Sequence, residues 1–258
     1  MNWIQMPEWN TNTIYAYSFY IGLTIIAFVS ESTGKFNLPY SKFAKNKGMD
    51  PRLGMFIIYF LPILCYILTW TSNHSPKSIY HLVLLFAFVF HFGKRCLEVL
   101  FLHKFSGKIG TVGVVFITFA YSNIGLLLGT IQNKVTSLEA GQNAPLLVLG
   151  FGFIVFLIGE GYNFYHHLLL SRLRKNSDDK EYKIPEGGLF PYLVCPHYFF
   201  ELLAWVGLAI MSMYLDVYMI VFIMIGYLSG RSNQTREWYL NRIPTFPKYR
   251  KRILPFLY

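Results

Sequence analysis

The stretch GGLFPYLVCPHYFFELLAWVG, Gly187 to Gly207, places a tyrosine, a histidine and a glutamate at the start of an apolar run. Pro196 predicts that a helix begins close by, because proline is favoured in a first helical turn. Tyr198, Glu201 and Trp205 are spaced by three and four residues, so they share one helix face. An aromatic belt at a membrane interface would explain the rings, but it needs no carboxylate one turn inside. The stretch is therefore either an interfacial belt or a place where chemistry occurs.

The composition is that of a membrane protein. Of the 258 residues, 54% are hydrophobic and 14% are charged, whereas soluble domains carry about a quarter charged residues. A membrane helix needs roughly 20 apolar residues. The runs that predict crossings are Thr13–Ser30, Gly54–Trp70, Ile79–Phe92, Gly110–Ile131, Pro145–Glu160, Tyr198–Met213 and Val217–Ser229. We expect an all-α, seven-helix membrane bundle that forms a single polytopic domain, residues 1–258.

The basic residues predict how this bundle is oriented. With the N-terminus placed outside, 21 of the 23 Lys and Arg residues fall in segments expected inside, and only Lys77 and Lys134 fall outside. This asymmetry follows the positive-inside rule. It predicts an outside or lumenal N-terminus and a cytosolic C-terminus, in the endoplasmic reticulum of a eukaryote or the inner membrane of a bacterium. Because the charge follows the membrane pattern, no nucleic-acid partner is expected.

A first polar cluster is HFGKRCLEVLFLHKFSG, His91 to Gly107. Lys94 and Glu98 are four residues apart, so an ion pair on one helix face is available. Charges near the end of a membrane helix usually pair or serve a function. A basic helix end whose lysine reaches the lipid headgroups is the alternative that the spacing leaves open.

A second cluster is GEGYNFYHHLLLSRLRK, Gly159 to Lys175. Asn163, His167 and Arg174 are separated by four and seven residues and predict a polar stripe along one helix. Arginines at the end of such a stripe suit a phosphorylated ligand. The pair His166–His167 suggests metal, but diiron desaturases need several histidine boxes and the chain has seven scattered histidines. No metal site is expected.

The third cluster is the tail RSNQTREWYLNRIPTFPKYRKRILPFLY, which begins at Arg231. It is basic and aromatic, and its prolines end any long helix. Binding to a membrane surface would explain the charge, but not the alternation of Tyr, Pro and Arg. The chain contains no GxGxxG after a strand, no P-loop and no GxSxG. Helix ends and loops would therefore bind any nucleotide.

The segments GGLFPYLVCPHYFFELLAWVGLAIMS and WYLNRIPTFPKYRKRILPFLY resemble the C-terminal domain of the steroid 5α-reductase family. This family includes polyprenol reductases and very-long-chain trans-2-enoyl-CoA reductases. The resemblance implies a seven-helix membrane fold with a catalytic region at residues 146–258 and NADPH bound from the cytosolic side.

Within the family, HFGKRCLEVLFLHKFSG is most similar to the enoyl-CoA reductases, as is the helix NFYHHLLLSRLR. Steroid 5α-reductases carry a Gln–Glu pair on the second helix and a tyrosine on the third. The corresponding residues here are Tyr59–Phe60 and Phe92. The resemblance therefore implies reduction of a trans-2-enoyl-CoA, the last step of fatty-acid elongation, with other elongation enzymes as partners.

The resemblance also implies roles for particular residues. Tyr198 would donate a proton, Lys94 would stabilise charge on the substrate oxygen, and Glu201 would orient Tyr198 or the nicotinamide amide. The residues matched to cofactor binding are Asn163, His167, Arg172, Arg174, His197, Arg231, Arg236, Tyr239 and Arg250. The chain departs from the family at His197, where asparagine is usual, at Ser171, where an arginine is usual, and at Arg236, where histidine is usual.

Several alternatives stay open. A steroid or polyprenol reductase would share the cofactor site but take another lipid acceptor from the bilayer. An isoprenylcysteine-methyltransferase-like enzyme would carry RHPxY where this chain has CPHY. A seven-helix receptor or transporter is the non-enzymatic option. A retinal receptor would need a lysine in the seventh helix, and a transporter would more often show internal repeats.

Overall fold

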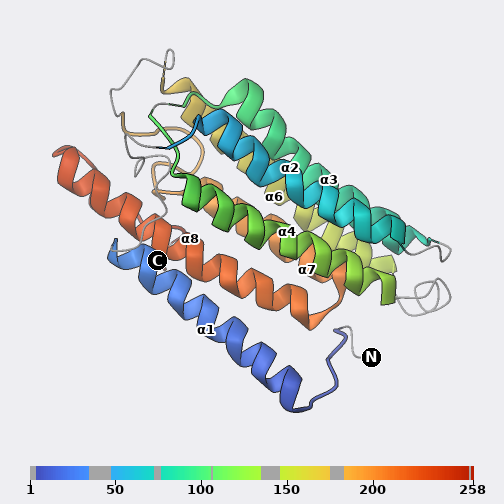
Figure 1. Ribbon diagram of the computed structural model, residues 1–258. Helices are drawn as coiled ribbons and strands as arrows, with labels where there is room; N and C mark the ends of the chain where they lie inside the picture. Colours follow the sequence, from blue (N-terminus) through green and yellow to red (C-terminus); the bar gives the residue numbers. More distant parts are fainter. Residues whose placement is uncertain are drawn as a thin grey trace.

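The computed structural model describes residues 4–34, 48–72, 77–105, 107–134, 146–174, 183–255 and 257–258 (Figure 1). Within these residues the fold is all-helical, without a β-strand. The α-helices are α1 (Thr11–Thr33), α2 (Pro51–Ser72), α3 (Ile79–Leu97), α4 (Thr111–Lys134), α6 (Leu146–Arg172), α7 (Pro196–Ser212) and α8 (Leu215–Arg242). A single π-helical turn, η2 (Glu98–Leu102), continues α3. The predicted all-α class is confirmed.

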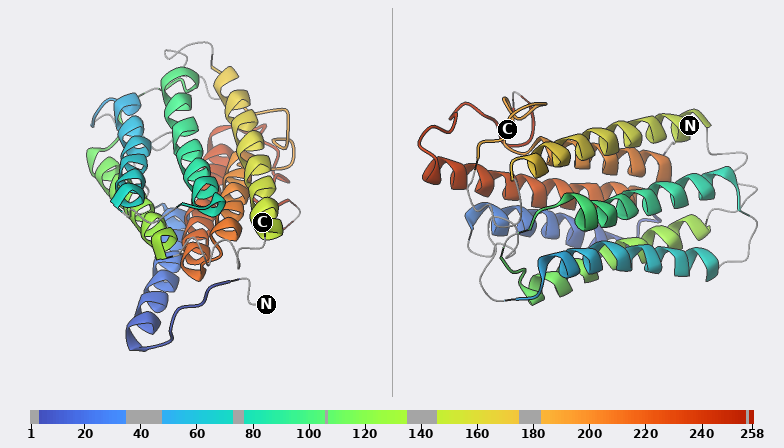
Figure 2. Two further views of the ribbon diagram at one scale, coloured as in Figure 1. Left: turned by 90° about the vertical axis from the view of Figure 1, so that its right-hand side faces the viewer. Right: turned by 90° about the horizontal axis from the view of Figure 1, so that it is seen from above.

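Successive helices run in alternate directions, so the segments between them gather at two ends of the bundle (Figures 1 and 2). One end, which we call the basic end, holds the described parts of segments 34–50, 98–110, 173–195 and 243–258. The other, the opposite end, holds the starts of α1, α3, α6 and α8 and the ends of α2, α4 and α7. Backbone pairing of Met49 with Ile109 occurs at the basic end, and pairing of Gln5 with Tyr214 occurs at the opposite end. The basic residues that lie outside the described segments are Lys35, Lys42, Lys45, Lys47, Lys175 and Lys180.

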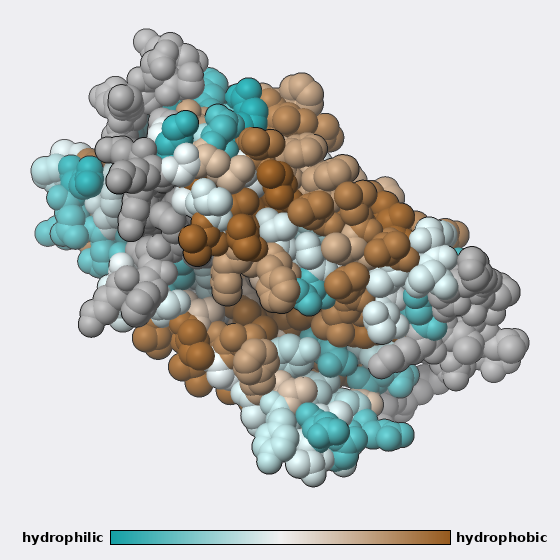
Figure 3. Space-filling model, in the orientation of Figure 1, coloured by the Kyte–Doolittle hydropathy of each residue, from teal (hydrophilic) through white to brown (hydrophobic). Residues whose placement is uncertain are grey.

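Five helices are long and apolar enough to cross a membrane, namely α1, α2, α4, α6 and α8. Their apolar side chains form a hydrophobic middle with polar residues toward both ends (Figure 3). The chain therefore has the character of a multi-pass membrane protein. The helices α3 and α7 are not among the five, so the count of seven crossings and the orientation of the termini stay predictions.

Close approach of helix backbones at glycine holds the bundle together. A Cβ on Gly159 of α6 would lie 2.4 Å from the backbone nitrogen of Ala204 in α7. A Cβ on Gly226 of α8 would lie 2.5 Å from the carbonyl oxygen of Thr24 in α1, and Gly230 repeats this contact one turn later. Small residues at such spacing are how membrane helices pack closely. As a result α1 rests chiefly on α8, at the edge of the molecule (Figure 2).

Two helices extend beyond the apolar runs that predicted them. The run ending at Glu160 continues as α6 to Arg172, and the run ending at Ser229 continues as α8 to Arg242. Helix α7 begins at Pro196, as the sequence predicted. The residue before the fifth helix, Pro145, lies outside the described residues. The extensions matter because they carry polar side chains into the basic end of the bundle.

Candidate functional site

A cavity of about 310 Å³ lies at the basic end, between α2, α3, α6, α7 and α8. Most of the charged side chains that line it are basic. The basic residues that line it are Arg95, Lys104, Lys108, Arg174, Lys183 and Arg231, whereas Glu201 is the one carboxylate among the lining residues. Such an excess of one sign in a recessed site attracts ligands of the opposite charge. The cavity is therefore suited to an anionic ligand, and to phosphate groups in particular because of its arginines.

Seven of the predicted site residues line this cavity. They are His167, Arg174, His197, Tyr198, Glu201, Arg231 and Tyr239. These residues come from α6 and the residues after it, the start of α7, and the end of α8. Three stretches that are distant in the sequence thus meet at one site.

The start of α7 brings Tyr198 and Glu201 onto the cavity wall. Cys195 is the N-cap residue and Pro196 occupies the first turn, so the helix begins just before Tyr198. Glu201 is buried and lies one turn further in. Trp205, on the same face, packs under the site with its ring 5.1 Å from that of His91. The predicted shared face is confirmed, and it carries a phenol and a carboxylate into the cavity.

Lys94 lies elsewhere. Its ammonium nitrogen is 2.8 Å from Glu160 Oε2, 3.4 Å from Glu98 Oε1 and 2.6 Å from Asn163 Oδ1. The predicted pair with Glu98 is thus confirmed. The lysine is not among the residues that line the cavity, and it borders a separate hollow with Leu97, Phe101 and Phe164 between α3, η2 and α6. The sequence did not predict Glu160 as a partner, although a carboxylate within an apolar run is itself a signal.

Asn163 links Lys94 to the start of α7. Its side-chain nitrogen donates to the backbone oxygen of His197 at 2.9 Å, and its oxygen accepts from Lys94. The amide therefore joins α3, α6 and α7 behind the cavity wall rather than on it.

Arg95, the neighbour of Lys94, does line the cavity. Its Nη1 atom lies 2.6 Å from Glu98 Oε2 and also 2.6 Å from His167 Nδ1. Its Nη2 atom donates to the hydroxyl of Tyr59 at 2.9 Å. Sequence reasoning identified neither Arg95 nor Tyr59 as a site residue, although Arg95 follows Lys94 and Tyr59 was matched to the Gln–Glu pair of steroid reductases.

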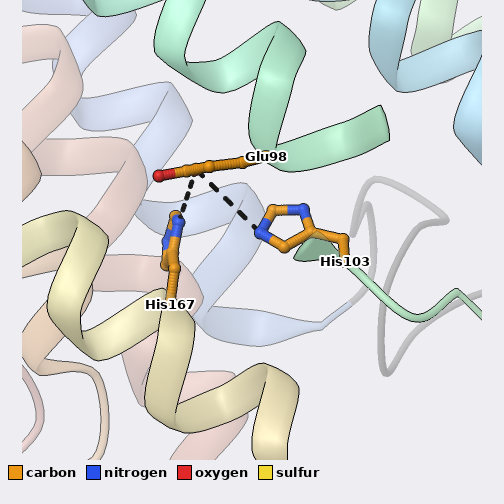
Figure 4. A group of neighbouring side chains, drawn as sticks. All are labelled: Glu98, His103 and His167. Carbon is orange, nitrogen blue, oxygen red and sulfur yellow. Dashed lines mark hydrogen bonds and ion pairs between the residues drawn. The ribbon is translucent and has the colours of Figure 1, made fainter. Parts of the chain in front are cut away.

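Glu98, His103 and His167 form a cluster of possible metal ligands (Figure 4). Glu98 Oε2 lies 2.8 Å from His167 Nδ1 and 4.0 Å from His103 Nε2. The guanidinium of Arg95 contacts both Glu98 and His167, so its positive charge opposes a divalent cation at this place. The cluster is better described as a buried ion-pair network than as a metal centre.

The surroundings lower the pKa values of two groups in this network, Glu98 and His103. Burial by itself raises the pKa of Glu98, but His167, Arg95 and Lys94 together hold that pKa well below its usual range. Burial, together with His167 and Arg95, lowers the pKa of His103 well below its usual value. Glu98 is therefore a carboxylate and His103 a neutral imidazole at physiological pH.

Three other predicted cofactor residues are absent from the cavity lining. Arg236 donates to the backbone oxygens of Lys248 and Arg250, at 2.6 and 3.1 Å. Arg250 is buried and donates to the backbone oxygen of Pro185 at 2.9 Å. Arg172 is exposed at the end of α6. Arg236 and Arg250 thus fix the C-terminal tail to α8 and to the segment before α7, and their binding roles stay predictions.

Arg231 forms an unexpected ion pair across the bundle. Its Nη1 atom lies 3.0 Å from Glu31 Oε2, and the two side chains are only 1% and 2% exposed. Glu31 is on α1 and Arg231 on α8, so the pair reinforces the glycine contacts of these two helices. Sequence reasoning missed Glu31, although a carboxylate at the end of an apolar helix was again a signal.

The fold and the cavity together define a class of protein. Apolar helices surround a cationic cavity at one end of the bundle, and this cavity also holds a phenol and a carboxylate. A site with these groups can bind an anionic cofactor next to an apolar substrate and exchange a proton with it. The class is that of multi-pass membrane proteins with a cationic cavity at one end of the helical bundle.

Comparison with known proteins identifies the family. The sequence model of the family described as 3-oxo-5-alpha-steroid 4-dehydrogenase matches residues 110–258. Human 3-oxo-5-alpha-steroid 4-dehydrogenase 1 is 32% identical over 212 residues, covering 81% of each chain. The very-long-chain enoyl-CoA reductase of Dictyostelium discoideum is 30% identical over 208 residues, covering 78% of this chain and 64% of that protein. Polyprenal reductase 1 of Oryza sativa subsp. indica is 35% identical over 120 residues, covering 44% of this chain and 34% of that protein.

The chain therefore belongs to the 3-oxo-5-alpha-steroid 4-dehydrogenase family, also called the steroid 5α-reductase family. Its members are oxidoreductases that act on C=C bonds. The resemblance found in the sequence is confirmed at the level of the family. The relatives include steroid, enoyl-CoA and polyprenal reductases, so family membership leaves the substrate of this chain open.

Proposed function

We propose that the protein reduces a C=C bond conjugated to a carbonyl group, with NADPH as cofactor and a trans-2-enoyl-CoA as substrate. One observation carries the proposal: Tyr198 and Glu201 lie on the wall of a cavity that six basic residues also line. The phenol can supply a proton, and the cations can bind the phosphates of a dinucleotide and of coenzyme A.

The cavity is lined by side chains of the types that bind the phosphates and the rings of NADPH. Arg174 and Arg231 line the wall and suit phosphates, and arginine also favours a 2′-phosphate over a free hydroxyl. His167, His197 and Tyr239 add donors and aromatic surface. When bound, NADPH would supply a hydride to the β-carbon of the substrate.

The residues of the chain would perform the remaining steps. Negative charge moves to the carbonyl oxygen as the C=C bond is reduced, and hydrogen-bond donors or cations directed at this oxygen stabilise it. Tyr198 would donate a proton to the α-carbon, and Glu201 would hold Tyr198 or the nicotinamide amide in place. The apolar helices would exclude water and bind the lipid chain.

Two features favour the enoyl-CoA substrate. The segment from His91 to Gly107 resembles that of enoyl-CoA reductases, and by the same resemblance Tyr59–Phe60 stands where steroid reductases have a Gln–Glu pair. The described basic end also exposes Lys104 and Lys108 at the cavity, where they could bind the phosphates of coenzyme A. On this proposal the basic end faces the cytosol, in the endoplasmic reticulum of a eukaryote or the inner membrane of a bacterium.

A 3-oxo-steroid is the second candidate substrate. It is favoured by the human steroid relative, to which the chain is similar over 81% of its length. The two candidates share the hydride step and the proton donor but differ in the group that binds the carbonyl oxygen.

The test is turnover of purified protein in detergent with NADPH and, in parallel, a trans-2-enoyl-CoA, a 3-oxo-Δ4-steroid and a polyprenal. We expect reduction of the enoyl-CoA, and a loss of about 10²–10⁴-fold in kcat for Tyr198→Phe because the proton donor is removed. Tyr192→Phe is the matched control, since this nearby side chain is exposed. Steroid turnover without enoyl-CoA turnover would contradict the substrate assignment. Absence of both activities and of NADPH binding would contradict the proposed function.

A further inference from the structure

We propose that Tyr59, held by Arg95, binds the carbonyl oxygen of the substrate and stabilises the negative charge that develops there. The inference rests on the proposed function and assigns a catalytic residue to it. It differs from the role that the family resemblance gave to Lys94. Hydrogen bonds connect the hydroxyl of Tyr59 to the guanidinium of Arg95, and this guanidinium to the carboxylate of Glu98.

Tyr59 presents a phenol to the cavity from α2. The side chain is buried, and it is one of the residues that line the cavity together with Tyr198 and Glu201. Its ring lies beside that of Tyr121, with centroids 6.3 Å apart and an interplanar angle of 25°. The packing fixes the ring, so the hydroxyl has a defined position, as a preorganised donor requires.

Arg95 makes this hydroxyl a stronger donor. Its Nη2 atom donates to the Tyr59 oxygen at 2.9 Å, and its guanidinium lies 4.9 Å from the centre of the same ring. A hydroxyl that accepts from a cation is polarised, and its own proton is donated more strongly to the next acceptor. A carbonyl oxygen in the cavity would therefore meet a phenol with a positive charge directly behind it.

Glu98 and His167 hold the guanidinium in place. Glu98 Oε2 lies 2.6 Å from Arg95 Nη1, and His167 Nδ1 is equally close to that nitrogen. The carboxylate is buried, which makes it a fixed anchor in an environment of low dielectric. Glu98 is accordingly a positioning residue, which acts on the substrate through Arg95 and Tyr59.

Lys94 is less well placed for this role. Its ammonium group contacts Glu160, Asn163 and Glu98, and the residue is absent from the cavity lining. Release from two carboxylates would be needed before it could reach a substrate, and separating a buried charge from its partners is costly. Tyr59 and Arg95, in contrast, both line the cavity.

The proposed reaction conserves electrons and protons. Hydride adds to the β-carbon, the π electrons of the C=C bond move to the α-carbon and onto the carbonyl oxygen, and the enolate oxygen accepts the hydrogen bond from Tyr59. The carbonyl then re-forms as Tyr198 delivers a proton to the α-carbon, and solvent returns a proton to Tyr198. The net reaction consumes one NADPH and one proton and yields NADP⁺ and the saturated product.

Tyr59→Phe tests the proposal, and Tyr66→Phe is the matched control. Tyr66 lies two turns away on α2, is also buried, and donates to the side chain of Gln132 rather than facing the cavity. We expect Tyr59→Phe to lower kcat with the enoyl-CoA by about 10²–10³-fold, the usual effect of removing one donor to an oxyanion. The Kd for NADPH should stay within about twofold, and the isotope effect with deuterated NADPH should rise as hydride transfer becomes slower. Tyr66→Phe should leave kcat and the isotope effect unchanged.

The outcomes separate this inference from the proposed function. If the wild-type protein reduces the enoyl-CoA and Tyr59→Phe does so at a similar rate, the role of Tyr59 is wrong and the proposed function stands. A loss of activity in Tyr59→Phe that equals its loss of NADPH affinity would also overturn the role. Arg95→Lys keeps the positive charge but loses the paired donors, so it should lower kcat by at least about tenfold while protein yield and folding are retained. If the wild-type protein reduces none of the three acceptors, the proposed function and the inference fail together.

Discussion

The two ends of the helical bundle bury polar groups in different ways. At the opposite end, among the described residues, Tyr80 donates to the backbone oxygen of Ser212 at 2.9 Å, and His81 Nε2 lies 3.1 Å from the backbone oxygen of Gln132. Tyr66 donates to the side chain of the same glutamine. At the basic end the buried groups are ions, with Arg95 and Glu98 among them.

This difference indicates where function lies. Hydrogen bonds between neutral groups join membrane helices at modest gain, typically about 0.6–2 kcal/mol. Buried charges are expensive in a membrane and are generally kept for a role in binding or catalysis. The hydrogen bonds described at the opposite end join helices, whereas the basic end buries charges around the candidate site, at a cost in stability. Substitutions at both ends can test this contrast.

The largest effect is expected for Glu98→Gln. The substitution removes the one negative charge that faces Arg95, Lys94 and His167 together, and breaking one partner of a buried ion pair costs about 3–5 kcal/mol. The free energy of unfolding, measured by titration with a denaturing detergent, should fall by about this amount, and reductase activity should fall with it. An unchanged free energy of unfolding would show that the network contributes nothing to stability.

The pH dependence of this effect has a defined sign. Because cations hold the pKa of Glu98 below its usual range, its stabilising contribution is fully present above the unfolded value of about 4.3. It is lost only as the pH falls through the lower folded value. The difference in stability between wild type and Glu98→Gln should thus be constant from about pH 5 to 8 and shrink below about pH 4. A difference that already changes near pH 6 would contradict the ionised state assigned to Glu98.

A smaller effect is expected for Glu31→Gln. Glutamine can still accept a hydrogen bond from Arg231, so only the charge is lost, and we expect a fall of about 1–3 kcal/mol in the free energy of unfolding. The control is Glu237→Gln, whose carboxylate is 45% exposed and lies 3.4 Å from Arg236. Exposed pairs contribute about 0–1 kcal/mol. Equal effects of the two substitutions would show that the α1–α8 pair behaves like a surface contact.

The sequence predicted the helices better than the partners of their polar residues. Apolar runs located all seven α-helices of the described chain, and the proline at 196 located the start of α7. The ends of α6 and α8 were missed because polar residues inside a bundle have no apolar periodicity to mark them. The Glu31–Arg231 pair joins residues 200 positions apart, and local spacing carries no information about such a contact.

Lys94 and Arg95 give a second example of a position in the fold that the sequence did not predict. Adjacent residues on a helix point about 100° apart, and here Arg95 lines the cavity whereas the ammonium group of Lys94 lies against Glu160 and Asn163. The π-helical turn that follows at Glu98–Leu102 also shifts the register of the last turn. Similarity of sequence pointed to Lys94 alone, whereas the residue of this pair that lines the cavity is Arg95.

The smallest effect is expected at the opposite end, for Tyr66→Phe. The ring stays stacked on Phe88, with centroids 4.6 Å apart, and only the hydrogen bond to Gln132 is lost. The free energy of unfolding should fall by about 1 kcal/mol, with turnover at the wild-type rate. Adding Gln132→Leu removes the glutamine that was left without its donor and should recover part of this loss. If Tyr66→Phe instead reduced turnover as strongly as Tyr59→Phe, the two ends would be coupled, and the basic end could not be treated as an independent site.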